Sequence, residues 1–245
     1  ENGWLLSESA LVTFGFSSRT VNSAAYSHRV AGWRLFVAGE KGSMAVGRRE
    51  PHASYSLARW SAERPLSNGW IRVGASWLAE QRTVLGGTFD PMFGHGKAQT
   101  WFADFEAQQR LGNGWSISGA YRLGWTSFPG GNVGTSATSI DLTKAGVFSG
   151  SDALALRFSQ PLRVESGSVG LTLPISWDYK TRTATEARRS ISMIPSGREL
   201  FVEAGYLTSF PRGYLSLHGF ARRQPDHVAA TGVDLGFALR TKLKL

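Results

Sequence analysis

The chain has 245 residues, with 27 lysines and arginines against 18 acidic residues, a formal charge of +9 and no cysteine. A hydrophobic content of 42% and an aromatic content of 12% supply enough apolar surface to exclude intrinsic disorder. The lack of cysteine excludes a disulfide-stapled module and a thiolate metal site, and no run approaches the roughly 18 apolar residues of a membrane helix.

Apolar and polar residues alternate with a period of two along most of the chain, and no helical spacing is sustained over three turns. Because side chains of a strand point alternately to its two faces, each run has one apolar and one polar face. After a lead segment at residues 1–9, we expect residues 10–245 to form a single β-domain. The predicted strands, in chain order, are 10–18, 33–40, 43–49, 54–64, 69–81, 98–111, 114–126, 136–147, 152–164, 168–179, 185–193, 199–209, 213–223 and 232–245.

The connections between these runs differ in length. Asn68-Gly69 and Asn113-Gly114 each stand between two alternating runs and predict tight hairpins, and Pro211-Arg212 predicts a third short turn. Longer polar stretches are predicted at 19–32, 82–97, 127–136 and 223–231. Short turns on one side and long loops on the other are typical of outer-membrane barrels.

Two all-β folds fit a period of two, a soluble sandwich and an outer-membrane barrel. The run 98–111 exceeds the usual sandwich strand of about 5–6 residues and suits a tilted membrane strand of about 9–11. Trp115 and Trp125 share one face and are separated by about 25 Å along a barrel axis, the height of a lipid-facing band. We therefore expect an all-β, antiparallel, transmembrane outer-membrane β-barrel of about twelve strands, with fourteen as the alternative.

The barrel interpretation assigns a position to the aromatic and charged side chains. The predicted lipid-interface aromatics are Trp33, Trp77, Trp115, Trp125, Trp177 and Tyr179. The predicted lumen-lining charged residues are Arg34, Arg72, Asp104, Glu106, Arg122, Arg157, Asp178, Glu203, Arg222 and Arg240. The excess of arginine either biases an open lumen toward anions or only keeps the lumen hydrated. Nucleic-acid binding is not expected, because the basic residues are scattered at strand spacing.

Catalytic patterns are incomplete. Ser43 lies in Gly-Ser-Met-Ala, the middle of the subtilisin nucleophile motif, but the flanking threonine and proline are missing and no base accompanies it. No two of the five histidines have metal-ligand spacing. Asp90 with His95, and Asp226 with His227, are the local acid–histidine pairs that a membrane-embedded enzyme would use. We predict no catalytic, cofactor-binding or metal site.

The last strand has the cleanest alternation in the chain and predicts a terminal signal for barrel assembly. Its residues are Leu235, Gly236, Phe237, Leu239, Leu243 and Leu245.

Four segments carry a resemblance to a known family. They are Phe158-Ser-Gln-Pro-Leu-Arg-Val-Glu-Ser-Gly167, Leu171-Thr-Leu-Pro174, Pro195-Ser-Gly-Arg-Glu-Leu200 and Arg222-Arg-Gln-Pro-Asp-His227. Residues 150–245 resemble the C-terminal region of bacterial subtilisin-like serine peptidases of the autotransporter type, in which a translocator barrel follows the peptidase. No catalytic residue carries over.

The resemblance implies a translocator domain that anchors in the outer membrane of a Gram-negative bacterium and supports secretion of an N-terminal passenger. Its expected partners are outer-membrane lipid, the barrel assembly machinery and the passenger polypeptide, and the expected state is monomeric. We expect no enzymatic activity and no cofactor. The alternative is a small channel or porin with mild anion preference, and a membrane-embedded enzyme or a soluble β-protein is the third hypothesis.

Overall fold

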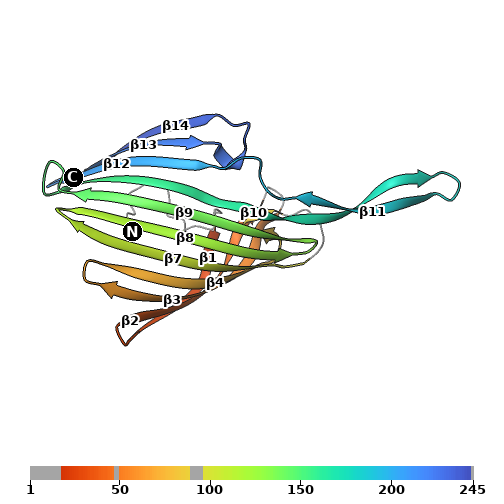
Figure 1. Cartoon of the computed structure of the whole chain (residues 1–245), viewed down its shortest axis with the longest axis horizontal. Coiled ribbons are helices and arrows are strands. Elements are labelled where there is room, and N and C mark those ends of the chain that lie inside the picture. Colours follow the sequence, from red (N-terminus) through yellow and green to blue (C-terminus); the bar gives the residue numbers. More distant parts are fainter. Residues whose placement is uncertain (1–17, 47–49, 89–95, 244–245) are drawn as a thin grey trace.

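The computed structural model describes residues 18–46, 50–88 and 96–243 (Figure 1). The elements are β1 (Ser18–Val30), β2 (Trp33–Val46), β3 (Glu50–Leu66), β4 (Gly69–Glu80), β5 (Thr83–Val84), β6 (Gly87–Thr88), β7 (Ala98–Gly112), β8 (Trp115–Phe128), β9 (Gly131–Ala145), β10 (Asp152–Asp178), β11 (Thr183–Ser192), β12 (Leu200–Phe210), β13 (Gly213–Arg223), the 3₁₀ turn η2 (Pro225–His227) and β14 (Val233–Leu243). The lead segment predicted at 1–9 and the first predicted strand up to residue 17 lie outside the described residues.

One antiparallel sheet dominates the fold. Its strands follow the order β1-β2-β3-β4-β7-β8-β9-β10-β12-β13-β14, and β11 pairs with β10 off this path. The predicted all-β antiparallel fold is confirmed, and over the described residues the sheet contains twelve strands, the number favoured from the sequence. Within the described ranges no pairing joins β1 to β14, so the sheet is not closed there. None of the helices described is long and apolar enough to cross a membrane.

The sheet curls, so that one face is enclosed and the other is exposed (Figure 1). Leu162 of β10 packs against a cluster formed by β3, β4 and β7, none of which neighbours β10 in the sheet. The cluster residues are Tyr55, Leu57, Leu78 and Phe102. We call the enclosed face, which carries Leu78 and Phe102, the inner face, and the opposite one the outer face.

Short turns join the strands at one end of the sheet. Both predicted hairpins are confirmed: Gly112 stands opposite Trp115 around the predicted Asn113-Gly114, and Leu66 stands opposite Gly69, so the other turn is Ser67-Asn68, one residue before the predicted pair. Asn113 and Gly114 both have positive φ, at 49° and 79°, as a type I′ turn requires. The predicted turn at Pro211-Arg212 is also confirmed, since Phe210 pairs with Gly213.

Several predicted connections are in fact strands. Residues 19–32, predicted as a long loop, form most of β1 and its turn; β1 is the edge strand of the sheet and its residues 22–30 are exposed on both faces, so its sequence lacks the apolar alternation of a buried strand. The loop predicted at 127–136 reduces to the turn between Phe128 and Gly131. Run 33–40 and the described part of run 43–49 form one strand, β2, so Gly42 lies inside a strand and not at a break.

The longest strand, β10, also joins two predicted runs, 152–164 and 168–179. Its first half pairs with β12 and its second half with β11, so β11 and β12 follow one edge of β10 in succession. Residues 193–199, which connect β11 to β12, are not part of either strand. The far part of β10 and β11 projects beyond the sheet as a hairpin (Figure 1).

Candidate functional site

The inner face buries polar and charged side chains beside its two apolar clusters, whereas the outer face exposes large apolar side chains. Polar and charged side chains are buried on the inner face, including Glu203, which is 0% exposed, and Arg122, which is 2% exposed. Large apolar side chains are exposed on the outer face, including Phe237 at 70% and Trp125 at 56%. The inner face is therefore the candidate functional surface, because there the fold gathers charge away from bulk solvent.

A row of alternating charge crosses four neighbouring strands of the inner face. Arg34, Glu63, Arg72 and Glu106 stand directly opposite one another on β2, β3, β4 and β7. Directly opposed residues share a face and approach closely, so each arginine meets a carboxylate. The N–O distances along the row are 3.3, 2.6 and 3.2 Å. This row is a continuous ion-pair network.

The same arrangement recurs on later strands. Arg122 Nε lies 2.7 Å from Asp104 Oδ1, and Arg157 Nε lies 2.6 Å from Asp141 Oδ1. Arg157 also stands opposite Glu203 on its other side. The charges on this part of the inner face are thus largely compensated by partners on adjacent strands.

The charged rows border a cavity of about 430 Å³. Its charged lining consists of Arg34, Arg59, Glu63, Arg72, Asp104, Glu106 and Arg122. Phe36, Trp60 and Ala75 also border it, so the cavity offers charged groups for water and hydrogen-bonding partners beside an apolar wall. Among the described residues, no three histidine or acidic side chains gather as a metal site.

The structure places most of the predicted lumen-lining residues on the inner face. These are Arg34, Arg72, Asp104, Glu106, Arg122, Arg157, Glu203, Arg222 and Arg240. Arg222 lies near the loop end, where its Nε donates to Glu199 Oε1 at 2.9 Å. Asp178 lies in the projecting hairpin instead, where its Oδ1 accepts the backbone N–H groups of Lys180 and Thr181.

The predicted aromatics divide in a similar way. Trp77, Trp101 and Trp125 stand opposite one another on β4, β7 and β8 and form a tryptophan row on the outer face. Trp33 and Trp115 lie beside the short turns at the other end. Trp177 and Tyr179 are exposed in the projecting hairpin, away from both positions.

The predicted terminal-strand residues lie on β14. Leu235, Phe237 and Leu239 are exposed on the outer face, and Gly236 stands opposite Phe220, whose ring occupies the space of a Cβ. Leu243 ends β14, and Leu245 lies outside the described residues.

Between β4 and β7, the chain folds back over the inner face. The carboxylate of Glu80, which is fully buried, accepts hydrogen bonds from Thr83 Oγ1 at 2.8 Å, Leu85 N at 2.7 Å and Gly86 N at 2.8 Å. Leu85 packs against both apolar clusters of the inner face. We call residues 81–88 the inner loop; it covers part of the enclosed face at the long-loop end.

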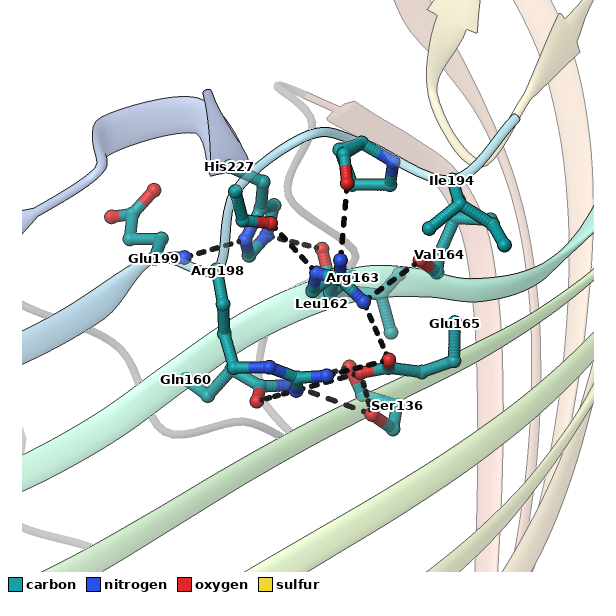
Figure 2. Close-up of polar contacts among 12 residues, drawn as sticks. Ser136, Gln160, Leu162, Arg163, Val164, Glu165, Ile194, Arg198, Glu199 and His227 are labelled. Atoms are coloured by element: carbon teal, nitrogen blue, oxygen red, sulfur yellow. Dashed lines mark hydrogen bonds and ion pairs between the residues drawn. The ribbon is translucent and has the colours of Figure 1, made fainter. Parts of the chain in front are cut away.

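A cluster of polar side chains holds the loop between β11 and β12, residues 193–199, against β10 (Figure 2). Arg163 donates to the carbonyls of Pro195 and Gly197 at 3.1 and 2.9 Å. Its guanidinium thus holds the loop beside β10 where neither β11 nor β12 pairs with that strand. Arg198 binds both oxygens of Glu165, at 2.8 and 2.7 Å, and also contacts Gln160.

His227 joins this cluster to the loop before β14. Its Nδ1 accepts the Glu199 N–H at 2.9 Å and its Nε2 donates to the Leu162 carbonyl at 3.1 Å (Figure 2). Burial lowers the pKa of His227 below its ordinary value, although the carbonyl of Leu162 and the charge of Glu199 oppose this. The neutral ring is therefore the form that fits these contacts.

Sequence reasoning did not find Glu80, Arg163, Glu165 and Arg198. Arg163 and Glu165 stand two positions apart in a predicted strand, and such an i, i+2 charge pair would have been a usable signal. Glu80 and Arg198 carry no local signal, because their partners are loop backbone and a distant strand.

Comparison with known proteins adds no family. No family model matches the chain, and no curated protein or solved structure is significantly similar to it.

Proposed function

We propose that this protein is an outer-membrane β-barrel whose outer face contacts lipid and whose inner face is a polar lumen. The observation that carries the proposal is the inversion of the two faces: Phe237 is exposed whereas Glu203 is fully buried. In water such an outer face would expose a large apolar patch, whereas in a bilayer it is the surface that lipid requires. The tryptophan row would then mark one membrane interface.

Within this class, we propose that the barrel is the translocator of an autotransporter and carries an N-terminal passenger to the cell surface. The resemblance of residues 150–245 supports this assignment. Two structural features are compatible with a lumen that does not conduct freely. The ion-pair rows compensate the arginine charge, and the inner loop covers the inner face at one end.

A small channel is the second candidate, and the cavity composition favours it. Four arginines and three acidic residues line the cavity, which leaves an excess of one positive charge. Such a lining would give a mild preference for anions.

Membrane insertion is tested by refolding the chain in detergent and transferring it to lipid vesicles, with the heat-modifiable gel band as the readout. The sharpest variant is Ile140→Arg, because Ile140 lies mid-strand on the outer face and is 51% exposed. In a bilayer midplane this change costs about 2–4 kcal/mol, so the vesicle-inserted fraction should drop steeply. In a soluble β-protein an exposed substitution changes stability by only about 0.5 kcal/mol.

Val228→Arg is the matched control, because Val228 is exposed in the loop before β14 rather than on a strand. It should insert like the wild type. Equal behaviour of Ile140→Arg and the wild type, or full solubility without detergent, would reject the membrane proposal.

Translocation and conduction are then separated by two readouts. A tagged passenger fused before Glu1 should become accessible on intact Gram-negative cells if the barrel is a translocator. Steady single-channel conductance without surface display of the passenger would support the channel instead.

A further inference from the structure

A shallow hollow of about 600 Å³ lies at the root of the hairpin formed by β10 and β11. Its borders include Gly130, Asn132, Ser168, Gly170 and Arg188. It lies apart from the inner face and from the cavity described above.

The register places the hollow on the outer face. Ser168 stands opposite Asn132 on β9, and Gly170 stands opposite Ser190 on β11. The intervening residue Val169 packs into the buried cluster of the inner face. Because side chains alternate along a strand, Ser168 and Gly170 point away from that cluster.

The hollow depends on a missing side chain. A Cβ at Gly170 would come to 2.8 Å from Nε of Arg188 and 3.0 Å from one of its terminal nitrogens. The guanidinium of Arg188 therefore lies across the bare backbone of Gly170. Even alanine at this position would displace it.

The charge of the hollow is positive and available. Arg188 is exposed and has no ion pair within the described part of the chain, whereas Arg189 stands opposite the buried Leu171 and so belongs to the other face. Glu186, two residues from Arg188, lies nearer the hairpin tip, opposite Pro174. Ser168 and Asn132 add neutral hydrogen-bonding side chains.

The hollow lies directly beyond the tryptophan row. Trp125 stands opposite Gly134, which in turn stands opposite Ser166. Two residues further from the short turns, Asn132 stands opposite Ser168 at the border of the hollow. If the tryptophan row marks the membrane interface, the hollow faces the lipid headgroups.

We propose that this hollow binds a phosphate group of a membrane lipid headgroup, with Arg188 as its principal ligand. A planar guanidinium presents two parallel donors to phosphate oxygens, and it does so most strongly where water is partly excluded. The inference rests on the proposed function, because the lipid reaches the hollow only if the outer face is in a membrane.

The test is native mass spectrometry of the full chain refolded in detergent, with bisphosphorylated lipid A and its dephosphorylated form as probes. The wild type should retain the phosphorylated lipid in preference to the dephosphorylated one. Arg188→Gln should weaken this binding about tenfold, the loss expected for one charge-assisted hydrogen-bonding partner. Gly170→Ala should weaken it less than Arg188→Gln does, because the new methyl group shifts only the flexible end of Arg188 and leaves its charge in place.

Arg212→Gln is the matched control, since Arg212 is exposed in a short turn at the opposite end of the sheet. It should bind like the wild type. Equal retention of both lipids, or equal loss in Arg212→Gln and Arg188→Gln, would overturn the site. Displacement of the lipid by millimolar inorganic phosphate would show a free-phosphate site and overturn the lipid assignment.

Vesicle insertion of the same samples separates this inference from the proposed function. If the protein inserts into vesicles but retains both forms of lipid A equally, the site is rejected and the membrane proposal stands. Protein that fails to insert rejects both.

Discussion

Arg157 and Asp141 form a two-point ion pair across β10 and β9, with Nε–Oδ1 at 2.6 Å and Nη2–Oδ2 at 2.8 Å. Both side chains are almost wholly buried, and Glu203 stands opposite Arg157 on β12. Three charges of alternating sign thus stand in one row on three strands. A row of this kind fixes strand register, because a slip of one residue would place its charges on the outer face.

Removing one member of this pair should destabilise the protein strongly. Asp141→Ala removes the two-point partner of the buried Arg157 guanidinium, and because Glu203 still stands opposite Arg157 the cost is about 2–3 kcal/mol rather than that of a fully uncompensated charge. The measurement is urea unfolding of the refolded protein, followed by the heat-modifiable band. Arg34→Ala is the comparison, because Arg34 is half-exposed in its pair with Glu63 and should cost about 1 kcal/mol or less. Equal midpoints for the two variants would contradict a structural role of the buried pair.

Two glycines of β8 provide a second matched comparison. A Cβ at Gly124 would come to 2.3 Å from Thr135 Oγ1 and 2.8 Å from the ring of Phe102, whereas at Gly119 it would meet only an oxygen at 3.7 Å. Gly124→Ala should therefore destabilise the protein by about 1–3 kcal/mol through overpacking, whereas Gly119→Ala should be tolerated. The same urea assay measures both variants. Similar midpoints would show that the side chains around Phe102 rearrange at little cost in free energy.

The sequence predicted the strand class and the faces well because both depend on local alternation. Arg122 and Trp125 fall on opposite faces by counting alone, and the structure places them so. The Asn113-Gly114 turn was equally local, since positive φ selects these residues at the turn, whereas in the other hairpin Gly69 already pairs with Leu66 and the turn consists of Ser67 and Asn68.

The errors arose where local signals have two meanings. Gly42 in β2 and Gly167 in β10 indicate a break in a sequence, but Gly42 lies opposite the bulge of β1 at Thr20 and Gly167 lets the backbone of Asn132 approach closely. The inner loop and the polar cluster at Arg163 could not be predicted, because Glu80 and Arg163 bind backbone groups whose positions only the fold determines.

Glu80 should control the inner loop. Glu80→Ala removes the acceptor for Thr83, Leu85 and Gly86 and leaves their donors unpaired in a buried site. We expect the loop to open more often and trypsin to cleave after Arg82 about tenfold faster, since proteolysis follows the open population. Glu186→Ala, an exposed change in β11, is the control and should leave cleavage at Arg82 unchanged. Unaltered cleavage in Glu80→Ala would mean that the packing of Leu85 alone holds the loop.

His227 should make the contact between the loops at 193–199 and 224–232 dependent on pH. Burial holds the folded pKa of His227 below its ordinary value of 6.5, while Glu199, Arg163 and Arg198 supply the nearby charges. The opened loops therefore take up a proton at a higher pH than the closed loops do. The stabilisation is present above pH 6.5, falls as the pH drops below that value, and is lost once the pH passes the folded pKa. Hydrogen exchange of the Glu199 amide, corrected for intrinsic rates, should show protection that declines across this window.

The variant His227→Asn isolates the titration from the contact. An asparagine oxygen can accept the Glu199 N–H in place of Nδ1 but does not titrate, while the bond to the Leu162 carbonyl is lost. Its protection should be lower than in the wild type at pH 7.5 and flat down to pH 5.5. His28→Asn, at an exposed position on β1, should retain the wild-type decline. A decline that persists in His227→Asn would assign the pH dependence to other groups, because no proton could then be gained at position 227.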